Sequence, residues 1–296
     1  MRNLAKCLVC LAEGFDTVYE STFSGGAEEA PRFFLNQRTE VAHGRIVRCR
    51  SCGFVFTNPQ FKAEEYSRIY AQVASEGQGN DVLAPAEALR FARLARLIES
   101  RLHKPQRLLD FGCADGGFLA RVKAVERIGY EVGDPSTKQV DGYRIITGDF
   151  IHDAGHEPLS QGSFDAVTAW DVFEHLPDLD EHVSAISKII APQGLLFVTV
   201  PNIDSIIAKI SGGRWNMFLL EHLWYFSPST LERFLSRHGF ASVEQGNLPF
   251  EVTLAHFANR FRQTYGVDFS PLIKPAKNLV IPLPIGLMYA IYQRRQ

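Results

Sequence analysis

Acidic side chains end three successive predicted strands, and they are the first candidates for ligand chemistry. Asp110, Asp134 and Asp149 each end or follow a short apolar run, at the edge where open parallel sheets bind their ligands. An isolated aspartate at a strand end is usually a turn residue or a helix cap. Three in succession predict a site for a ligand that carries positive charge or hydroxyl groups.

The first of these acids leads into a glycine-rich turn, RLLDFGCADGGFLARV at 107–122. Bare backbone lets a ligand approach closely, and both dinucleotides and methyl donors bind at such turns, in front of a helix N-terminus. Asp110 discriminates between the two. A carboxylate about 6 Å from a pyrophosphate repels it by roughly 3 kcal/mol at an effective dielectric constant of about 20, which is about a hundredfold in affinity. The same carboxylate attracts S-adenosylmethionine, which carries an ammonium and a sulfonium and no phosphate.

The later acids fit the other parts of that nucleoside. Asp134 lies 24 residues after Asp110 and can accept hydrogen bonds from both ribose hydroxyls. Asp149 offers an acceptor for the adenine amino group, and Phe150 offers a ring edge for the adenine. Asp171, at the end of the fourth predicted strand, completes the candidate cofactor-binding set.

Two Glu-His pairs supply the candidates for proton transfer. His175 follows the fourth predicted strand, whereas Glu221 and His222 lie in the aromatic segment RWNMFLLEHLWYFS at 214–227. Histidine accepts a proton near neutral pH, particularly beside a carboxylate that orients it. His175 could equally be a structural residue at a helix start, and His222 a hydrogen-bonded histidine within an aromatic cluster. The aromatic rings suit the apolar faces of a sugar, or they pack the segment onto the core.

Four of the five cysteines form two Cys-x-x-Cys pairs, Cys7/Cys10 and Cys49/Cys52. Four thiolates can bind one Zn²⁺ tetrahedrally and leave no position open, so the metal would be structural. Reduced structural cysteines are the alternative. The sequence shows no secretory signal pattern, and we expect a reducing, cytoplasmic compartment.

The elements that would position these side chains follow from the pattern of apolar residues. A helical period covers 85–104, and beyond it short apolar runs alternate with helical stretches. Strands are predicted at 108–112, 130–134, 143–149, 164–172, 194–201, 240–247 and 287–294, and helices at 117–125, 179–190, 227–239 and 250–266. Such alternation predicts right-handed β-α-β units and a parallel sheet covered on both faces.

The composition is that of an ordinary soluble globular protein, with 46% apolar residues, 22% charged residues and a net charge of −2. Nucleic-acid-binding proteins usually have a strong basic excess, so we expect no nucleic-acid partner. The apolar stretch 278–292 is shorter than a bilayer span and contains two prolines. We expect a buried strand there, with at most a weak membrane-surface contact. The sequence leaves the oligomeric state open.

In the order and spacing of its motifs, the chain resembles the class I S-adenosylmethionine-dependent methyltransferases. The resemblance rests on LLDFGCADGGF, VGDPS, TGDF, FDAVTAWDVFEHLPD and PQGLLFVTVPN, and it covers about 105–296. It implies a Rossmann-like α/β sheet of seven strands whose last strand is antiparallel. It also implies that Asp110, Gly112, Ala114 and Gly116 line the methionine end of the cofactor, although the family usually has glycine in place of Ala114.

The segments PNIDS and EHLWYFSPSTL resemble a subgroup of bacterial sugar and polysaccharide methyltransferases, some of which begin with a zinc-binding module. We accordingly divide the chain into three parts: a zinc-ribbon-like module at 1–60, a helical linker at 61–104 and the methyltransferase domain at 105–296. Substrate-side insertions are expected at about 203–226 and 250–284.

This resemblance implies methyl transfer to a sugar that is nucleotide-linked or part of a glycan or glycolipid. His175, Glu221 and His222 would lie at the acceptor. The tyrosines that relatives place near the substrate have no clear counterpart here, where Leu219 and Leu220 precede Glu221, and this favours O-methylation over C-methylation.

Two other hypotheses remain. An RNA methyltransferase could use the zinc module to bind its substrate, but the near-neutral charge balance of residues 1–60 disfavours it. A non-catalytic zinc-binding scaffold could have kept the fold, but acids stand at all three cofactor positions.

Overall fold

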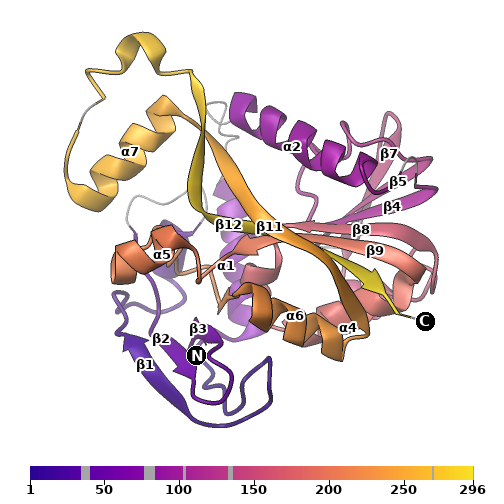
Figure 1. Ribbon diagram of the computed structural model, residues 1–296, viewed down its shortest axis with the longest axis horizontal. Helices are drawn as coiled ribbons and strands as arrows, with labels where there is room; N and C mark the ends of the chain where they lie inside the picture. Colours follow the sequence, from indigo (N-terminus) through magenta and orange to yellow (C-terminus); the bar gives the residue numbers. More distant parts are fainter. Residues whose placement is uncertain (35–40, 77–83, 103–104, 133–135, 269, 296) are drawn as a thin grey trace. The chain divides into compact units, whose positions relative to one another are not determined.

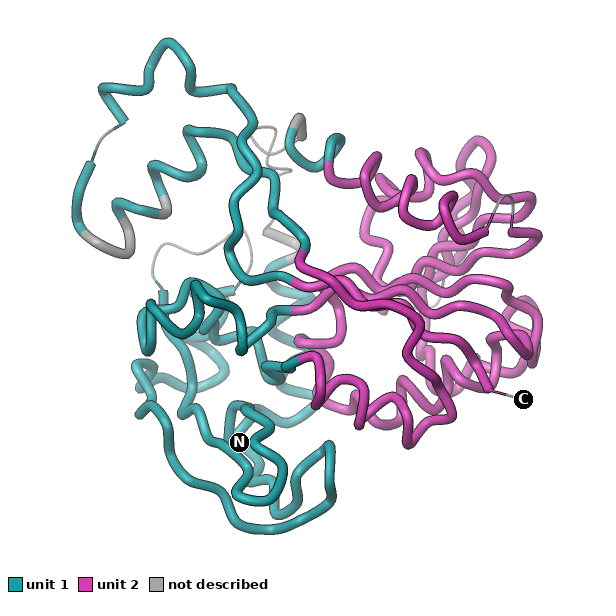
Figure 2. The backbone as a smooth tube through the Cα atoms, viewed as in Figure 1, with its two compact units in different colours: residues 1–89, 201–227, 248–287 teal, residues 90–200, 228–247, 288–296 magenta. Residues whose placement is uncertain are grey.

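The computed structural model describes residues 1–34, 41–76, 84–102, 105–132, 136–268 and 270–295. The chain divides into two compact units (Figure 2). The amino-terminal unit comprises residues 1–89, 201–227 and 248–287, and the sheet unit comprises residues 90–200, 228–247 and 288–296. Both predicted insertions therefore belong to the same unit as the cysteine-rich amino terminus.

A mixed eight-stranded sheet has the strand order β11-β12-β9-β8-β4-β5-β7-β6 (Figure 1). Its strands are β4 (Arg107–Phe111), β5 (Glu126–Val132), β6 (Ser136–Val140), β7 (Tyr143–Gly148), β8 (Phe164–Trp170), β9 (Ile190–Pro201), β11 (Phe240–Thr253) and β12 (Val280–Arg294). The pairs β4–β5, β4–β8, β5–β7 and β8–β9 are parallel, as predicted. β4, β8 and β9 are buried along most of their length, which explains their almost continuous apolar sequences.

The sheet has one strand more than the seven expected. β6 pairs antiparallel with β7 across a two-residue turn at Asp141 and Gly142, and Asp-Gly is a strong hairpin sequence. Only ten residues separate β5 from β7, fewer than a helical crossover needs, so a hairpin strand takes the place of a helix. The antiparallel direction of the last strand, β12, stays a prediction.

The helix predicted at 117–125 is not formed. The segment between β4 and β5 is a series of turns, in which Ala120 N–H donates to Gly116 O and Val122 N–H to Phe118 O. Adjacent glycines at its start disfavour a helix, and the buried Phe118 and Val122 hold the turns against the core. The glycine turn therefore lacks the helix N-terminus that the sequence argument had placed behind it.

The other predicted helices are present. The helices of at least four residues are α1 (Ala63–Glu76), α2 (Ala84–Glu99), α3 (Phe150–Asp153), α4 (Leu179–Ile189), α5 (Ile206–Ser211), α6 (Pro228–Arg237) and α7 (Leu254–Tyr265). Short 3-10 turns are η1 (Ala30–Phe33), η3 (Phe173–His175), η4 (Gly212–Arg214) and η5 (Lys274–Ala276). Figure 1 shows α2 along one face of the sheet and α4 and α6 along the other. None of the helices in the described ranges is long and apolar enough to span a bilayer.

The amino-terminal unit contains a second sheet of four antiparallel strands in the order β1-β2-β3-β10. They are β1 (Phe15–Tyr19), β2 (Ile46–Cys49), β3 (Val55–Thr57) and β10 (Trp224–Tyr225). β10 comes from the aromatic segment at 214–227, which is thus joined to the cysteine-bearing strands by backbone hydrogen bonds. The side chains of Trp215, Trp224 and Tyr225 are at most 2% exposed. Of the two interpretations of these rings, the structure supports core packing.

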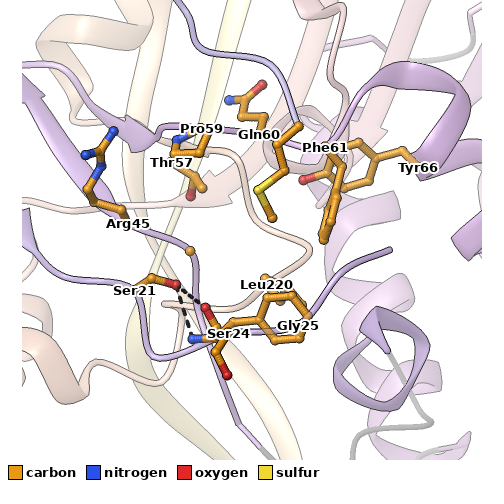
Figure 3. Close-up of a pocket in the computed structure, with 13 residues that line it drawn as sticks. Ser21, Ser24, Gly25, Arg45, Thr57, Pro59, Gln60, Phe61, Tyr66 and Leu220 are labelled. Atoms are coloured by element: carbon orange, nitrogen blue, oxygen red, sulfur yellow. Dashed lines mark hydrogen bonds between the residues drawn. The ribbon is translucent and has the colours of Figure 1, made fainter. Parts of the chain in front are cut away.

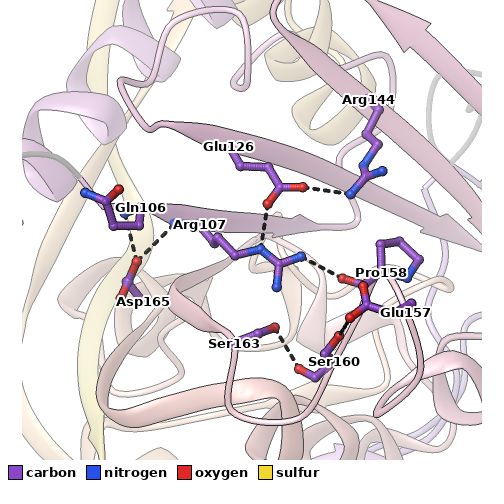
Figure 4. Close-up of polar contacts among 9 residues, drawn as sticks. All are labelled: Gln106, Arg107, Glu126, Arg144, Glu157, Pro158, Ser160, Ser163 and Asp165. Carbon is purple, nitrogen blue, oxygen red and sulfur yellow. Dashed lines mark hydrogen bonds and ion pairs between the residues drawn. The ribbon is translucent and has the colours of Figure 1, made fainter.

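Ion pairs tie together the amino-terminal ends of the sheet strands, away from the carboxyl ends at which the candidate site lies (Figure 4). Arg107 Nε donates to Glu126 Oε2 over 2.6 Å, and an Arg144 Nη donates to Glu126 Oε1 over 2.7 Å. Asp165 accepts the backbone N–H groups of Gln106 and Arg107. β4, β5, β7 and β8 are fixed to one another by these contacts.

Candidate active site

Asp110 lies within β4, where its side chain is only 2% exposed. Thr168 of β8 donates a 2.6 Å hydrogen bond from Oγ1 to Asp110 Oδ1. Burial raises the pKa of Asp110 to about 7, although the Thr168 bond lowers it and the charge of Glu131 raises it further. Near neutral pH, Asp110 is therefore divided between its neutral and ionised forms, and a cation bound beside it would favour the ionised form.

Protein side chains lie against the bare backbone of the glycine turn. A Cβ atom at Gly112 would come within 2.4 Å of Val172 Cγ2, and one at Gly116 within 2.6 Å of the Tyr143 ring. Ala114 has φ 47°, a left-handed conformation that costs a residue with a Cβ roughly 1–2 kcal/mol. This conformation gives a physical reason why glycine suits the position of Ala114.

Glu131 of β5 is an acidic residue of this region that the sequence analysis missed. Its Oε2 accepts the Ala114 N–H over 2.8 Å, and its Oε1 accepts the Val132 N–H over 3.2 Å. Burial raises the pKa of Glu131, and the two backbone bonds oppose that rise. An acid directly after the short uncharged run Ile128, Gly129 and Tyr130 was the available signal. Asp134, the predicted ribose ligand, lies outside the described residues.

The predicted adenine pair lies at the start of α3. Asp149 caps this helix, accepting the N–H groups of Ile151 and His152 at 3.1 and 3.3 Å. Phe150 is 1% exposed and packs against Phe111, with 4.4 Å between the ring centroids. Contact of either residue with adenine stays a prediction, because both make structural contacts that need no ligand.

Asp171 follows β8 with φ 56°, in the left-handed region. It forms an ion pair with Arg90, and its Oδ1 accepts a 2.6 Å hydrogen bond from Thr199 Oγ1. Glu174 is 1% exposed nearby, and Oε2 of its carboxyl has no hydrogen-bond partner within the described ranges. Burial, and then the charge of Asp171, hold the pKa of Glu174 well above its usual range. This end of β8 thus concentrates acidic groups beside one arginine.

The three proton-transfer candidates fall in different units. His175 ends the η3 turn in the sheet unit, where its side chain is half-buried. Its backbone N–H donates a hydrogen bond to Val172 O. Glu221 and His222 belong to the amino-terminal unit and are 0% and 6% exposed.

His222 Nδ1 lies 2.8 Å from Met217 O. Because a carbonyl oxygen only accepts, Nδ1 carries the proton, so in the neutral ring Nε2 has the lone pair. His222 thus has the tautomer in which Nε2 can take up a proton.

The four cysteines of the two pairs converge within the amino-terminal unit. Their Sγ atoms all lie within 4.8 Å of one another, and the pairs Cys7–Cys52 and Cys10–Cys49 are each 3.6 Å apart. All are free thiols. A tetrahedral zinc with bonds of about 2.3 Å needs sulfur atoms roughly 3.8 Å apart. The thiol positions fit one such ion with little movement.

Known proteins of similar sequence are methyltransferases. A family model described as a methyltransferase domain matches residues 86–245, more than half of the chain. A ubiquinone biosynthesis O-methyltransferase of Burkholderia pseudomallei is 25% identical in an alignment 200 positions long, which covers 60% of this chain and 83% of that protein. The C-methyltransferase NovU of Streptomyces niveus is 29% identical over 104 residues, 35% of this chain and 24% of NovU.

Among solved structures, one similar chain is the Burkholderia thailandensis 1,6-didemethyltoxoflavin-N1-methyltransferase with bound 1,6-didemethyltoxoflavin and S-adenosylhomocysteine. It is 16% identical, with a TM-score of 0.48 over 84% of this chain and 99% of that one. The match to the family model rests on sequence and spans the glycine turn, the acids at the strand ends and η3. The chain belongs to the methyltransferase-domain family and is an S-adenosylmethionine-dependent methyltransferase.

Proposed function

We propose that the enzyme transfers a methyl group to a hydroxyl oxygen of a sugar that is nucleotide-linked or part of a glycan or glycolipid. The observation that carries the proposal is the buried Glu221–His222 pair, in which Nδ1 of His222 is held by a carbonyl and Nε2 has the lone pair. A hydroxyl acceptor must lose a proton as its oxygen attacks, and an imidazole nitrogen suits this task at neutral pH. The O-methyltransferase name of the Burkholderia pseudomallei relative agrees with an oxygen acceptor.

In this mechanism His222 Nε2 takes the hydroxyl proton while the oxygen forms its bond to the methyl carbon. Glu221, the buried residue that precedes His222 in the chain, would supply negative charge for the imidazolium that results. S-adenosylmethionine, when bound, supplies the methyl group on a sulfonium that leaves as a neutral thioether. His175, in the sheet unit, is the alternative base.

The residues that would hold the cofactor surround the glycine turn. Asp110 and Glu131 supply negative charge for the ammonium and sulfonium, and Gly112, Ala114 and Gly116 form the backbone of the turn. Because Tyr143 and Val172 occupy the space above Gly116 and Gly112, these two side chains would have to move for a ligand to contact that backbone. Asp149, Phe150 and Asp171 remain in the proposed set.

We also propose that Cys7, Cys10, Cys49 and Cys52 bind one structural Zn²⁺. Four thiolates fill a tetrahedral coordination sphere, so this metal would stabilise the amino-terminal unit and have no position for substrate.

An aromatic hydroxyl is the second candidate acceptor, because the Burkholderia pseudomallei relative, which is matched over 83% of its length, is named a ubiquinone biosynthesis O-methyltransferase. Transfer of labelled methyl from S-adenosylmethionine to fractionated bacterial extract, followed by hydrolysis and chromatography of the product, separates the two acceptors. We expect the label in an O-methyl monosaccharide, whereas label in a phenol ether would overturn the sugar proposal.

The same assay tests the base. His222→Gln should lower turnover at least tenfold and leave cofactor affinity unchanged, since proton transfer typically contributes about 10²–10⁴-fold. The exposed His156 provides a matched control, and His156→Gln should react at the wild-type rate. If His175→Gln lowers turnover and His222→Gln does not, the base has been assigned wrongly.

A further inference from the structure

The amino-terminal unit contains a cavity of about 270 Å³ (Figure 3). Its walls combine apolar side chains, among them Phe23, Phe61 and Leu220, with polar ones, among them Arg45, Gln60 and Tyr66. The volume lies just below the range of about 300–1,000 Å³ that is typical of small-molecule sites. The cavity therefore suits a single ring with its substituents better than a whole nucleotide.

Gln60 is a buried polar residue in this wall with its hydrogen bonds unmade. Its side chain is 1% exposed, and neither Nε2 nor Oε1 of its amide has a partner among the residues that the structure describes. Leaving a buried amide unpaired is costly, so such a group usually has a ligand or a water to bind. Two other polar groups of the wall are already engaged: Thr57 Oγ1 donates to His222 O, and Ser21 Oγ donates to Phe23 O.

Tyr66 provides a second polar group. Figure 3 shows its hydroxyl turned toward the cavity, with Arg45 on the opposite side. Burial, and then the charges of Tyr225 and Glu221, hold the pKa of Tyr66 well above its usual range. Its hydroxyl therefore stays protonated and can both donate and accept a hydrogen bond.

The Gln60 amide and the Tyr66 phenol match a ligand that is rich in hydroxyl groups. An amide and a phenol each donate and accept, as hydroxyl groups require, and the rings of Phe23 and Phe61 can cover the apolar face of a sugar. No carboxylate belongs to the described wall, and Arg45 is its one guanidinium, with Nε bound to Asn58 O. An apolar ligand would leave the Gln60 and Tyr66 groups unmatched, and a cationic ligand would be repelled by Arg45.

We propose that this cavity binds the ring of the acceptor sugar, with Gln60 and Tyr66 hydrogen-bonding to its hydroxyl groups. The inference rests on the proposed sugar acceptor, and it adds the binding site and the two residues that determine specificity. It follows that Gln60 and Tyr66 govern acceptor binding, while the glycine turn governs cofactor binding.

The test uses the purified full-length protein without cofactor and four probes: the methyl glycosides of glucose, galactose, mannose and rhamnose. Binding is followed by saturation-transfer NMR. We expect at least one glycoside to bind, and Gln60→Leu or Tyr66→Phe to weaken that binding about tenfold, as the loss of a hydrogen bond in a buried site predicts. Gln72→Leu, on the exposed surface of α1, and Tyr19→Phe, outside the cavity wall, are the matched controls and should bind as wild type.

A melting curve separates a binding role from a structural one. Because the Gln60 amide makes no hydrogen bond in the free protein, Gln60→Leu should keep or raise the melting temperature while it loses the glycoside. If none of the four glycosides binds, or if binding is the same in both cavity variants and the wild type, the inference is overturned.

Kinetics distinguish this failure from failure of the proposed function. If the labelled product is a sugar but both variants keep the wild-type KM for it, the cavity inference alone fails. If the product is not a sugar while glycoside binding still depends on Gln60 and Tyr66, the proposed acceptor fails and the cavity remains a sugar-binding site.

Discussion

Replacing Asp110 by asparagine should stabilise the protein at neutral pH while weakening cofactor binding. The Asp110 carboxyl is buried, and its pKa is raised from 3.8 to about 7 in the folded chain. Between these two values the folded state keeps a proton that the unfolded state releases. The contribution of protonated Asp110 to the free energy of unfolding is therefore fully present below the unfolded-state pKa of 3.8. It is lost as the pH rises through the folded-state pKa of about 7.

The size of the effect follows from the difference in pKa. One pKa unit corresponds to about 1.4 kcal/mol, so the whole shift amounts to about 4 kcal/mol, of which about 3 kcal/mol is lost between pH 5 and pH 8. For a protein of this size that corresponds to roughly 6–12 °C in melting temperature. Asparagine keeps an oxygen that can accept the Thr168 hydrogen bond but has no charge to desolvate.

Scanning calorimetry across pH 5–8 measures this contribution. The other titrating groups are present in both proteins, so the difference between wild type and Asp110→Asn reports the titration of Asp110 together with its interaction with Glu131. We expect the variant to gain stability over the wild type progressively with pH, and the exposed Asp141→Asn to show no such gain. A constant difference between wild type and Asp110→Asn across this range would refute the reasoning.

Three further predictions concern other parts of the molecule. A chelator should remove about one zinc per chain from the metal-loaded protein, as metal analysis would show, and should lower its melting temperature, as calorimetry would show. Cys49→Ser should bind less zinc and melt at a lower temperature than the metal-loaded wild type. Glu126→Gln should cost about 1 kcal/mol in urea unfolding, because its contacts to Arg107 and Arg144 are partly exposed, and should leave turnover unchanged. Gly112→Ala should weaken cofactor binding, because the new methyl group would meet Val172 in a left-handed backbone; equal affinity by calorimetry would contradict this.

Long apolar runs made much of the sheet predictable. The strands at 108–112, 164–172 and 194–201 correspond to β4, β8 and β9, because strands buried on both faces need almost continuous apolar sequence. The convergence of the four cysteines was predictable from their spacing, because two Cys-x-x-Cys pairs can supply the four ligands of one tetrahedral metal ion.

The errors have local physical causes. The pattern at 117–125 contains apolar residues at helical spacing, but Gly116 and Gly117 at its start and the need to bury Phe118 favour turns. β6 was missed because its five residues are mostly exposed and show no apolar pattern. The Asp-Gly turn was the sequence signal for this hairpin.

Site residues were harder to predict than strands. Asp110 and Glu131 both lie within strands, but only tertiary burial reveals which carboxyl is desolvated and which amide it binds. Asp149 is harder to assign for another reason. Its side chain caps α3 in the protein alone, and only a bound ligand would show whether it also contacts adenine.

Calorimetric titration of the purified enzyme with S-adenosylmethionine, S-adenosylhomocysteine and NAD⁺ tests most directly the claim that buried carboxyls at the glycine turn select a cationic nucleoside. We predict that one S-adenosylmethionine binds per chain, that it binds more tightly as pH rises toward 7, and that Asp110→Asn loses this pH dependence. The neutral S-adenosylhomocysteine should bind more weakly, and NAD⁺ should not bind. Binding of NAD⁺ at the turn, or S-adenosylmethionine affinity that is unchanged by both pH and Asp110→Asn, would contradict the claim.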